Sequence, residues 1–397
     1  MSPSPKTTLL LLLLLLPSLL PSALPSPTAI GVTYSPSNSS SASPAAPPGL
    51  PPPDRVAAAV SALKIPSVRL PDPTPQLLRA FLYSNTSLLL SVPNALVPSL
   101  AANRSAALSW LYRHVVPFYP RARVSAISVG SNVLDAHPNY AGLLVPALRN
   151  FRSALRDLGI RDVAVSTTFS FINVMTTTFP PSAARFQEPY AEAVMKPLLD
   201  FLRDTNSSFM VNIYPYNLYR LRCEIPLGFA LFQEHPFMYR DDLTTGVRYR
   251  NLFDMMVDAV VAAMAVAGHE NIPVIVAETG WPSSSPDATE IDANELYSGM
   301  YVKGLLGHLR SGQGTPLRKE GVAEAYVYEL VDEEAKGTAS QARARNWGIL
   351  YANFSEKYEV QFSCAGYCGS PEELLIGFVV MLLILAWLIW YVPNSPW

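Results

Sequence analysis

Short apolar runs and helical patterns alternate along most of this sequence, and this alternation restricts its possible folds more than any other feature. Consecutive parallel strands need crossover connections, which are usually helices, so the pattern predicts a parallel sheet. The runs predicted as strands are Ile30–Tyr34, Ser67–Leu70, Leu88–Val92, Ala126–Val129, Val163–Ser166, Met210–Ile213, Val274–Ala277 and Ala325–Tyr328. The segments predicted as helices are 54–63, 75–83, 104–116, 139–158, 189–203, 249–267 and 292–310.

Units of this kind that close on themselves form an α/β fold, the (β/α)8 TIM barrel. A doubly wound open sheet is the alternative, but no glycine-rich phosphate loop follows the first predicted strand. The chain has 397 residues, of which 49% are hydrophobic and 15% charged, which is enough to bury one large core. We therefore predict a single barrel domain over residues 30–362. Segment 217–248 lacks clear periodicity and is predicted to form an excursion over the barrel mouth.

The two ends of the chain have the composition of targeting segments. Residues 1–29 contain the run Leu9–Leu16 followed by small residues and prolines, which is typical of a secretory signal peptide. Residues 363–397 include the uncharged apolar stretch Leu374–Val392, which is long enough to cross a bilayer. Small residues and a polar spacer before it match a GPI-anchor signal, whereas a transmembrane helix would usually be followed by lysine or arginine. We expect a GPI anchor and keep a transmembrane tail as the alternative.

The expected location is the extracellular face of the plasma membrane or the cell wall, reached through the secretory pathway. N-x-S/T sequons agree with secretion and predict glycosylation at Asn38, Asn85, Asn103, Asn206 and Asn353. The 3 cysteines do not form a disulfide framework, and Cys223 is predicted to be a free, buried thiol.

Charge and composition also exclude classes of partner. The formal net charge is −2 and no basic run is present, so nucleic acid is not expected to bind. The 5 histidines form no cluster with metal-ligand spacing, so we predict neither a metal site nor another cofactor. We expect the protein to act as a monomer.

Candidate functional residues follow from the barrel prediction, because chemistry in such barrels gathers at the C-terminal ends of the strands. The residues predicted there are Tyr34, Asp72, Asn94, Ser131, Asn132, Tyr214, Tyr216, Glu278, Asp332 and Glu333. Glu278 ends the apolar run Val274–Ala277, and a carboxylate at the end of a buried strand is costly to leave unpaired. The sequence therefore predicts that Glu278 has a partner.

Several segments together resemble glycoside hydrolase family 17, the plant glucan endo-1,3-beta-glucosidases. The matching segments are IGVTY (30–34), LPPPDRV (50–56), VRLPDPTPQLLRA (68–80), SVPNALV (91–97), VNIYPY (211–216), NLFDMMVDAV (251–260), VIVAETGWPS (274–283), GTPLR (314–318) and RNWGILY (345–351). They occur in order over residues 30–351, and AETGWPS and NIYPY are the most specific of them.

This resemblance implies a (β/α)8 barrel with an open cleft for 1,3-beta-glucan, such as callose. It also implies hydrolysis with retention, in which two carboxyl groups about 5 Å apart act as nucleophile and general acid/base. Glu278 matches the nucleophile. The residues expected to bind sugar or support the site are Tyr34, Tyr214, Trp281, Glu333 and Lys336. As alternatives, Glu278 could be a structural carboxylate paired with Lys336, and Tyr214 and Trp281 could be core aromatics.

One segment departs from the family pattern at the general acid. The family sequence V-G-N-E-V carries the acid, whereas this chain has ISVGSNVLD at 127–135, with Ser131 in place of the asparagine and Asn132 in place of the glutamate. An amide cannot protonate a leaving glycosidic oxygen. Asp135 could replace the acid if the chain bulged to bring it over the same sugar oxygen.

Three functions therefore stay open. The first is a cell-wall 1,3-beta-glucan hydrolase that uses Glu278 and has reduced activity. The second is a non-catalytic, surface-tethered protein that binds 1,3-beta-glucan without cutting it. The third is a structural surface glycoprotein with no affinity for glucan. Turnover separates the first two functions, and glucan binding separates both from the third.

Overall fold

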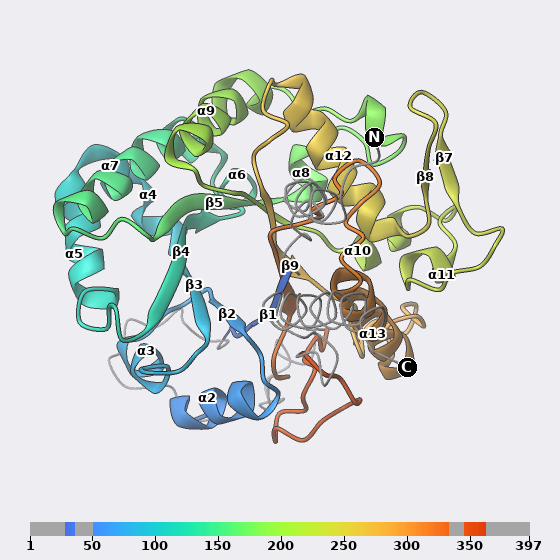
Figure 1. Cartoon of the computed structure of the whole chain (residues 1–397), viewed down its shortest axis with the longest axis horizontal. Coiled ribbons are helices and arrows are strands. Elements are labelled where there is room, and N and C mark those ends of the chain that lie inside the picture. The colour runs from blue at the N-terminus through green and yellow to red at the C-terminus, as the bar shows by residue number, and fades with distance from the viewer. Residues whose placement is uncertain (1–27, 36–50, 333–344, 363–397) are drawn as a thin grey trace, which may run out of the picture.

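The computed structural model describes residues 28–35, 51–332 and 345–362. Within them, eight parallel strands close into a barrel in the order β1-β10-β9-β6-β5-β4-β3-β2 (Figure 1). The strands are β1 Ala29–Thr33, β2 Ser67–Leu70, β3 Ser87–Val92, β4 Arg123–Ser131, β5 Ala164–Ser170, β6 Phe209–Asn212, β9 Val274–Thr279 and β10 Glu324–Tyr328. The closed ring confirms the predicted (β/α)8 barrel and rules out the open sheet.

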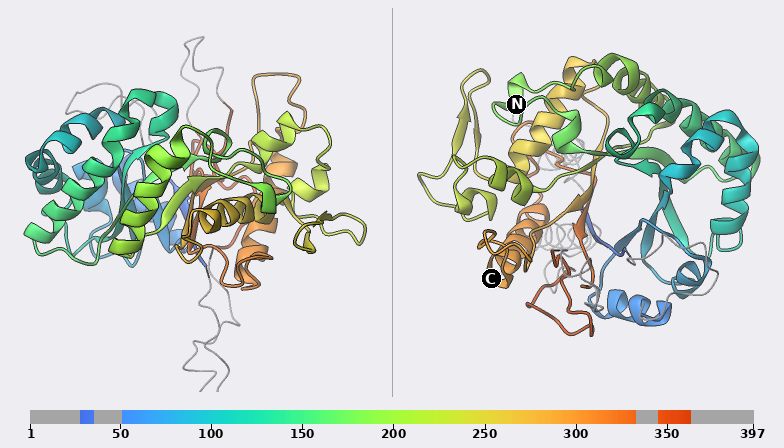
Figure 2. Two further views of the ribbon diagram at one scale, coloured as in Figure 1. Left: turned by 90° about the horizontal axis from the view of Figure 1, so that it is seen from above. Right: turned by 180° about the vertical axis from the view of Figure 1, so that it is seen from behind.

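Helices surround the ring of strands, as the views from above and behind show (Figure 2). The α-helices of the described part are α2 Pro53–Ala62, α3 Pro75–Ala80, α4 Val97–Ala102, α5 Arg104–His114, α6 Val133–Ala136, α7 Leu144–Asp157, α8 Phe171–Val174, α9 Lys196–Thr205, α10 Pro215–Leu221, α11 Leu227–Ala230, α12 Leu252–Val266 and α13 Glu295–Arg310. Several begin at residues that suit a helix start. Asn251 and Asn294, for example, accept a hydrogen bond from a backbone N–H of the first turn of α12 and α13.

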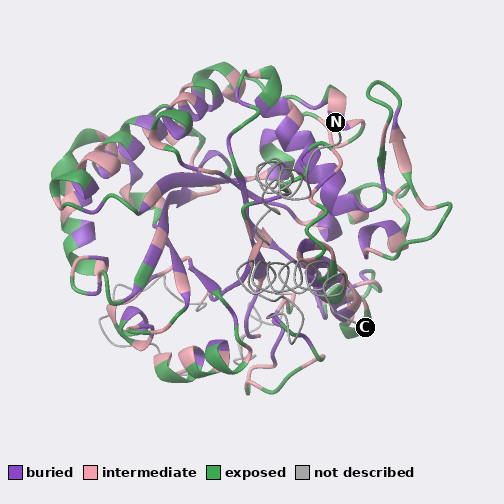
Figure 3. Cartoon of the chain, viewed as in Figure 1, coloured by how far each residue is buried: buried purple, intermediate pink, exposed green. Residues whose placement is uncertain are grey.

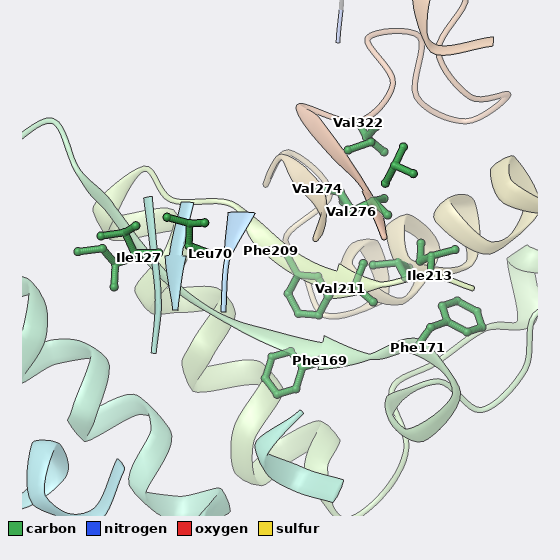
Figure 4. Close-up of a cluster of buried hydrophobic side chains, with 14 of the residues drawn as sticks. Leu70, Ile127, Phe169, Phe171, Phe209, Val211, Ile213, Val274, Val276 and Val322 are labelled. Carbon is green, nitrogen blue, oxygen red and sulfur yellow. The ribbon is translucent and has the colours of Figure 1, made fainter. Parts of the chain in front are cut away.

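The main core lies between the outer faces of the strands and the helices. The strands are mostly buried, and most helices carry both buried and exposed residues, whereas α12 is buried at nearly every position (Figure 3). Phe169, Phe209 and Val211 belong to this layer and are drawn in Figure 4. A smaller cluster formed by Leu89, Ala126, Met210, Ile275, Ala277 and Tyr326 is separate from this core. Because side chains alternate along each strand, this cluster is the filling of the barrel.

The excursion between β6 and α12 contains α10, α11 and a hairpin of β7 Arg240–Asp242 and β8 Val247–Tyr249. The hairpin and α11 lie at one side of the ring, beyond α10, α12 and α13 (Figure 1). The prediction that this segment lies over the barrel mouth was therefore wrong. Cys223 lies in it as a free thiol, but it is exposed, so the prediction that it is buried was also wrong. The segment follows neither helix nor strand periodicity, so no buried face could be predicted for it and the exposure of the thiol could not be inferred.

The predicted targeting segments, residues 1–29 and 363–397, lie almost wholly outside the described residues. Within the described ranges, no helix combines the length and the apolar character needed to cross a membrane. The same ranges hold no group of three or more histidine, cysteine, aspartate or glutamate side chains arranged to bind a metal ion.

Asp258 of α12 is a fully buried carboxyl that is predicted to make folding stability depend on pH. It accepts hydrogen bonds from the Thr315 hydroxyl and, at 2.9 Å, from the Leu317 N–H, but burial dominates and raises its pKa to about 7. The raised pKa means that the folded state holds a proton that the unfolded state releases above its ordinary pKa of about 4. Stability is therefore full below about pH 4 and falls as pH rises to about 7.

The variant Asp258→Asn is expected to lose this pH dependence. An asparagine keeps an acceptor for the Leu317 N–H, and the Thr315 hydroxyl can turn to the Arg318 carbonyl, 3.3 Å away. Between pH 4 and pH 8 the free energy of unfolding of the wild type should fall by about 2–4 kcal/mol more than that of the variant. Urea denaturation at several pH values measures this, and parallel curves for the two proteins would contradict it.

Candidate active site

Glu278 lies near the carboxyl end of β9 and is held by two side chains. The Arg69 guanidinium of β2 forms an ion pair with Glu278 Oε1 and donates a hydrogen bond to it. The Tyr214 hydroxyl, just after β6, donates a hydrogen bond to Glu278 Oε2 at 2.8 Å. Both carboxylate oxygens are therefore engaged, and the orientation of the carboxylate is fixed by one group on β2 and one just after β6.

Arg69 is the partner that the sequence prediction missed. Its side chain is only 1% exposed, and its second terminal nitrogen lies 3.3 Å from Ser131 Oγ on β4. Lys336, considered as a partner for Glu278, lies outside the described residues, as does Glu333. The available signal was an arginine inside the apolar strand SVRL, since a buried guanidinium needs an acid.

Tyr214 is a permanent donor rather than an acid that titrates. Burial first, and the nearby Glu278 carboxylate second, raise its pKa well above the ordinary tyrosine value. The hydroxyl therefore stays protonated at any physiological pH. It can orient the carboxylate of Glu278 without competing with it for a proton.

The carboxyl end of β4 holds the position where the family pattern has its general acid. Gly130 has a positive φ of 78°. The Asn94 side chain forms two hydrogen bonds with the backbone of the next residue: it accepts from the Ser131 N–H at 2.8 Å and donates to the Ser131 carbonyl at 2.9 Å. Asn132 follows in the left-handed region, with φ 51° and ψ 40°, which asparagine tolerates better than most residues.

The Asn132 side chain is partly buried and faces a second amide. Asn212, at the end of β6, donates from Nδ2 to Asn132 Oδ1 at 3.4 Å. Asn212 Oδ1 is buried and has no hydrogen-bond partner among the described residues. The acid position therefore carries two neutral amides next to the Arg69–Glu278 pair, which Arg69 links to β4 through Ser131.

Asp135, considered as a substitute acid, lies on the surface of α6. It is exposed, and its side chain hydrogen-bonds with Asn173 of α8. Partial burial raises the pKa of its carboxyl. Its partner is thus a surface amide rather than Asn132, Asn212 or Glu278.

Two predicted site aromatics are parts of the core. Trp281 is 1% exposed, packs against Tyr216 and Tyr301, and donates from its indole nitrogen to the Asp292 carbonyl at 2.7 Å. At this exposure Trp281 packs as a core aromatic, the alternative that the sequence left open, and its hydrogen bond supports the loop after β9. Tyr34 is also buried, and burial together with Glu329 raises its pKa to about 12.

Other strand-end residues on the predicted list hold loops together. The Tyr216 hydroxyl donates to Glu290 at 2.8 Å, and the Arg345 guanidinium is the main cause that lowers the pKa of Glu290 to about 2. Asp332 pairs with the buried Lys357 ammonium at 2.6 Å. Four sequon asparagines, Asn85, Asn103, Asn206 and Asn353, are exposed, whereas Asn38 lies outside the described residues.

The barrel and its strand-end glutamate indicate a protein of the glycoside hydrolase class, and comparison with known proteins narrows the class to one family. Residues 47–362 match the family model "Glycosyl hydrolases family 17". The chain belongs to this family.

Curated relatives include glucan endo-1,3-beta-glucosidase 2 of Arabidopsis thaliana, 38% identical over 79% of this chain and 62% of its own length. Glucan endo-1,3-beta-glucosidase 12 of Arabidopsis thaliana is 35% identical over 78% of this chain and 57% of its own length. The chain thus spans about three fifths of the length of these relatives. Among solved structures, a beta-1,3-glucanase and allergen of Cryptomeria japonica pollen is 32% identical with a TM-score of 0.75, covering 85% of this chain and 99% of its own.

Proposed function

We propose that this domain binds 1,3-beta-glucan chains at the site around Glu278 and cleaves them slowly by a retaining mechanism. The observation that carries the proposal is the contrast between the two halves of the site. Glu278 is held by Arg69 and Tyr214, while the amide of Asn132 stands at the acid position. The substrate class comes from the relatives, whose names describe 1,3-beta-glucan as what they act on.

Glu278, with Arg69 and Tyr214 beside it, has the oriented carboxylate that formation of a glycosyl-enzyme intermediate requires. A carboxylate oxygen of Glu278 attacks the anomeric carbon from the face opposite the leaving group. Arg69 supplies positive charge and Tyr214 supplies a fixed hydrogen bond, so the carboxylate is aimed before substrate arrives. When the intermediate breaks down, the same two groups stabilise the departing carboxylate.

The acid half explains why cleavage of glucan is expected to be slow. A sugar hydroxyl is a poor leaving group unless it receives a proton, and positioned acid catalysis contributes about 10²–10⁴-fold. The amide of Asn132 can donate a hydrogen bond but cannot transfer the proton. The rate of glucan hydrolysis should therefore lie below that of a site with a carboxyl group by about this factor.

The same observation favours a second candidate function, glucan binding without cleavage. If the loss of the acid is complete, the barrel holds 1,3-beta-glucan and releases it unchanged. The two candidates share the site and the ligand, and they differ only in turnover.

The test uses the purified protein with a 1,3-beta-glucan oligosaccharide and, as a control ligand, a 1,4-beta-glucan oligosaccharide of equal length. We expect calorimetry to detect binding of the 1,3-linked ligand, and NMR to show slow release of products that are first formed as the β-anomer. Binding with no product after prolonged incubation would establish the second candidate. No affinity for the 1,3-linked ligand would overturn both.

The hydrogen bond between Tyr214 and Glu278 gives a separate prediction. Tyr214→Phe removes a bond to a charged group, which is worth about 1.5–3 kcal/mol, so kcat/KM for an aryl beta-glucoside should fall about 10–100-fold. Tyr219→Phe is the matched control, because its hydroxyl donates to Asp292 at 2.8 Å outside the site. The two variants should differ in rate while unfolding at similar temperatures. Equal values of kcat/KM for the two variants would show that the Tyr214 hydroxyl does not contribute to the reaction.

We further propose that the protein is secreted and held at the outer face of the plasma membrane or in the cell wall. Residues 1–29 have the composition of a signal peptide, residues 363–397 that of an anchor signal, and four sequon asparagines are exposed. Release from membranes by a phosphatidylinositol-specific phospholipase C would support a GPI anchor. Retention after that treatment, with release only by detergent, would indicate a transmembrane tail.

A further inference from the structure

The geometry points to a particular class of glycosyl donor for this site, one whose leaving group departs as a stable anion without being protonated. Aryl and acyl beta-glucosides are donors of this kind. The inference rests on the proposed function, because it takes Glu278 as the nucleophile. It goes further, because it assigns the donor and acceptor chemistry that suits the residues at the other half of the site.

The first support is that the nucleophile does not depend on the missing acid. Glu278 is oriented by Arg69 and Tyr214, which come from β2 and from the residue after β6. Neither group lies on β4. The absence of a carboxyl at position 132 therefore does not disturb the Glu278 carboxylate, which forms the first bond to the sugar.

The second support is the character of the leaving-group side. Asn132 and Asn212 present neutral amides there, and Arg69 reaches the same strand end through Ser131 Oγ at 3.3 Å. An amide N–H stabilises an anionic oxygen, whereas a carboxylate at this position would repel it. Asn212 Oδ1 is buried without a partner in the described part of the chain, and as an amide oxygen it adds no negative charge at this strand end.

The two steps balance without a proton donor. In the first, a Glu278 oxygen bonds to the anomeric carbon, the bond from this carbon to the leaving oxygen breaks, and the electron pair departs with the aryloxide or carboxylate. In the second, an anionic acceptor such as azide or a carboxylate attacks the anomeric carbon, and the Glu278 carboxylate is released. Water reacts slowly in this step because no base removes its proton. An anion has no proton to lose, so it reacts faster than water.

The test is a series of aryl 1,3-linked beta-glucobiosides whose phenols span a wide range of acidity, measured with and without sodium azide. With the most acidic phenol we expect a burst of about one equivalent of phenolate per site, followed by slow turnover that azide accelerates to give the β-glycosyl azide. Across the series, the rate of the burst should change at least about 100-fold, because no acid compensates for a poor leaving group.

Two variants sharpen the test. Asn132→Glu should make the burst rate nearly independent of the acidity of the phenol and should abolish the azide product. Asn132→Gln, of the same length but neutral, should keep the dependence of the burst rate and the azide product. Glu278→Gln should give no burst, which excludes a contaminant. A flat dependence in the wild type, or no azide product, would overturn the inference. Calorimetric binding of the 1,3-beta-glucan oligosaccharide is independent of these readouts, so failure of the donor class is distinguishable from failure of the proposed function.

Discussion

Asn132→Glu is expected to raise the rate of 1,3-beta-glucan hydrolysis by about 10²–10⁴-fold, the contribution of a positioned general acid. The new carboxyl would stand at the end of β4, where the Asn212 amide, which now donates to Asn132 at 3.4 Å, can hold it. Glu278 already has its supporting groups, so the change adds only what the site lacks. The measurement is the initial rate of reducing-end formation from a glucan oligosaccharide.

The matched control is Asn132→Gln, which adds the same length without an ionisable group. Both variants place a longer side chain on the left-handed backbone of residue 132, at φ 51°, where asparagine is favoured. Each should therefore lose a similar amount of stability, on the order of 1 kcal/mol. A gain in rate for both variants, or for neither while both stay folded, would show that position 132 is not the site of proton donation.

Arg69→Met is expected to lower the free energy of unfolding by about 3–5 kcal/mol and to abolish glycosyl transfer. The Arg69 side chain is 1% exposed and that of Glu278 14%, so the substitution leaves a carboxylate in a largely buried place without its counter-charge. Methionine fills much of the same volume, so the loss should come from the charge rather than from a cavity. Urea denaturation followed by fluorescence gives the free energy.

Arg104→Met is the matched control on the surface. Arg104 pairs with Asp157 at 3.3 Å, but the two side chains are 54% and 44% exposed, so its loss should cost at most about 1 kcal/mol. The double variant Arg69→Met with Glu278→Gln removes both buried charges and should recover most of the stability lost in Arg69→Met. A cost for Arg69→Met no greater than that for Arg104→Met would mean that the pair does not stabilise the fold.

The barrel could be predicted because each of its strands is a local apolar run between helical patterns. Val274–Thr279, for example, needs no distant residue to be recognised as a strand. Short helices are harder, and α4 at Val97–Ala102 was not predicted because six residues carry too little periodicity. The hairpin of β7 and β8 was missed for the same reason, since its strands have three residues each.

The site could be predicted only in part. The position of Glu278 follows from its place at a strand end, but its partner Arg69 is 209 residues away in sequence. Their contact depends on how the barrel closes, and no local pattern reports that. The sequence left open whether Trp281 contacts sugar or packs in the core, because a tryptophan after a strand can face either way, and its hydrogen bond to the Asp292 carbonyl holds it in the core.

The pairing of β1 with β10 has a consequence for how the chain acquires its structure. Ala29–Thr33 has β2 as its first neighbour, but its second neighbour, Glu324–Tyr328, is the last strand of the barrel to be synthesised, so the other edge of β1 stays unpaired until then. Such long sequence separations slow folding and leave strand edges open while the chain waits. Arg69 and Glu278 lie on β2 and β9, the strands that flank this seam. Their ion pair therefore depends on a closed ring, and a ribosome-bound fragment ending before β10 should have neither the closed ring nor the contact between Arg69 and Glu278.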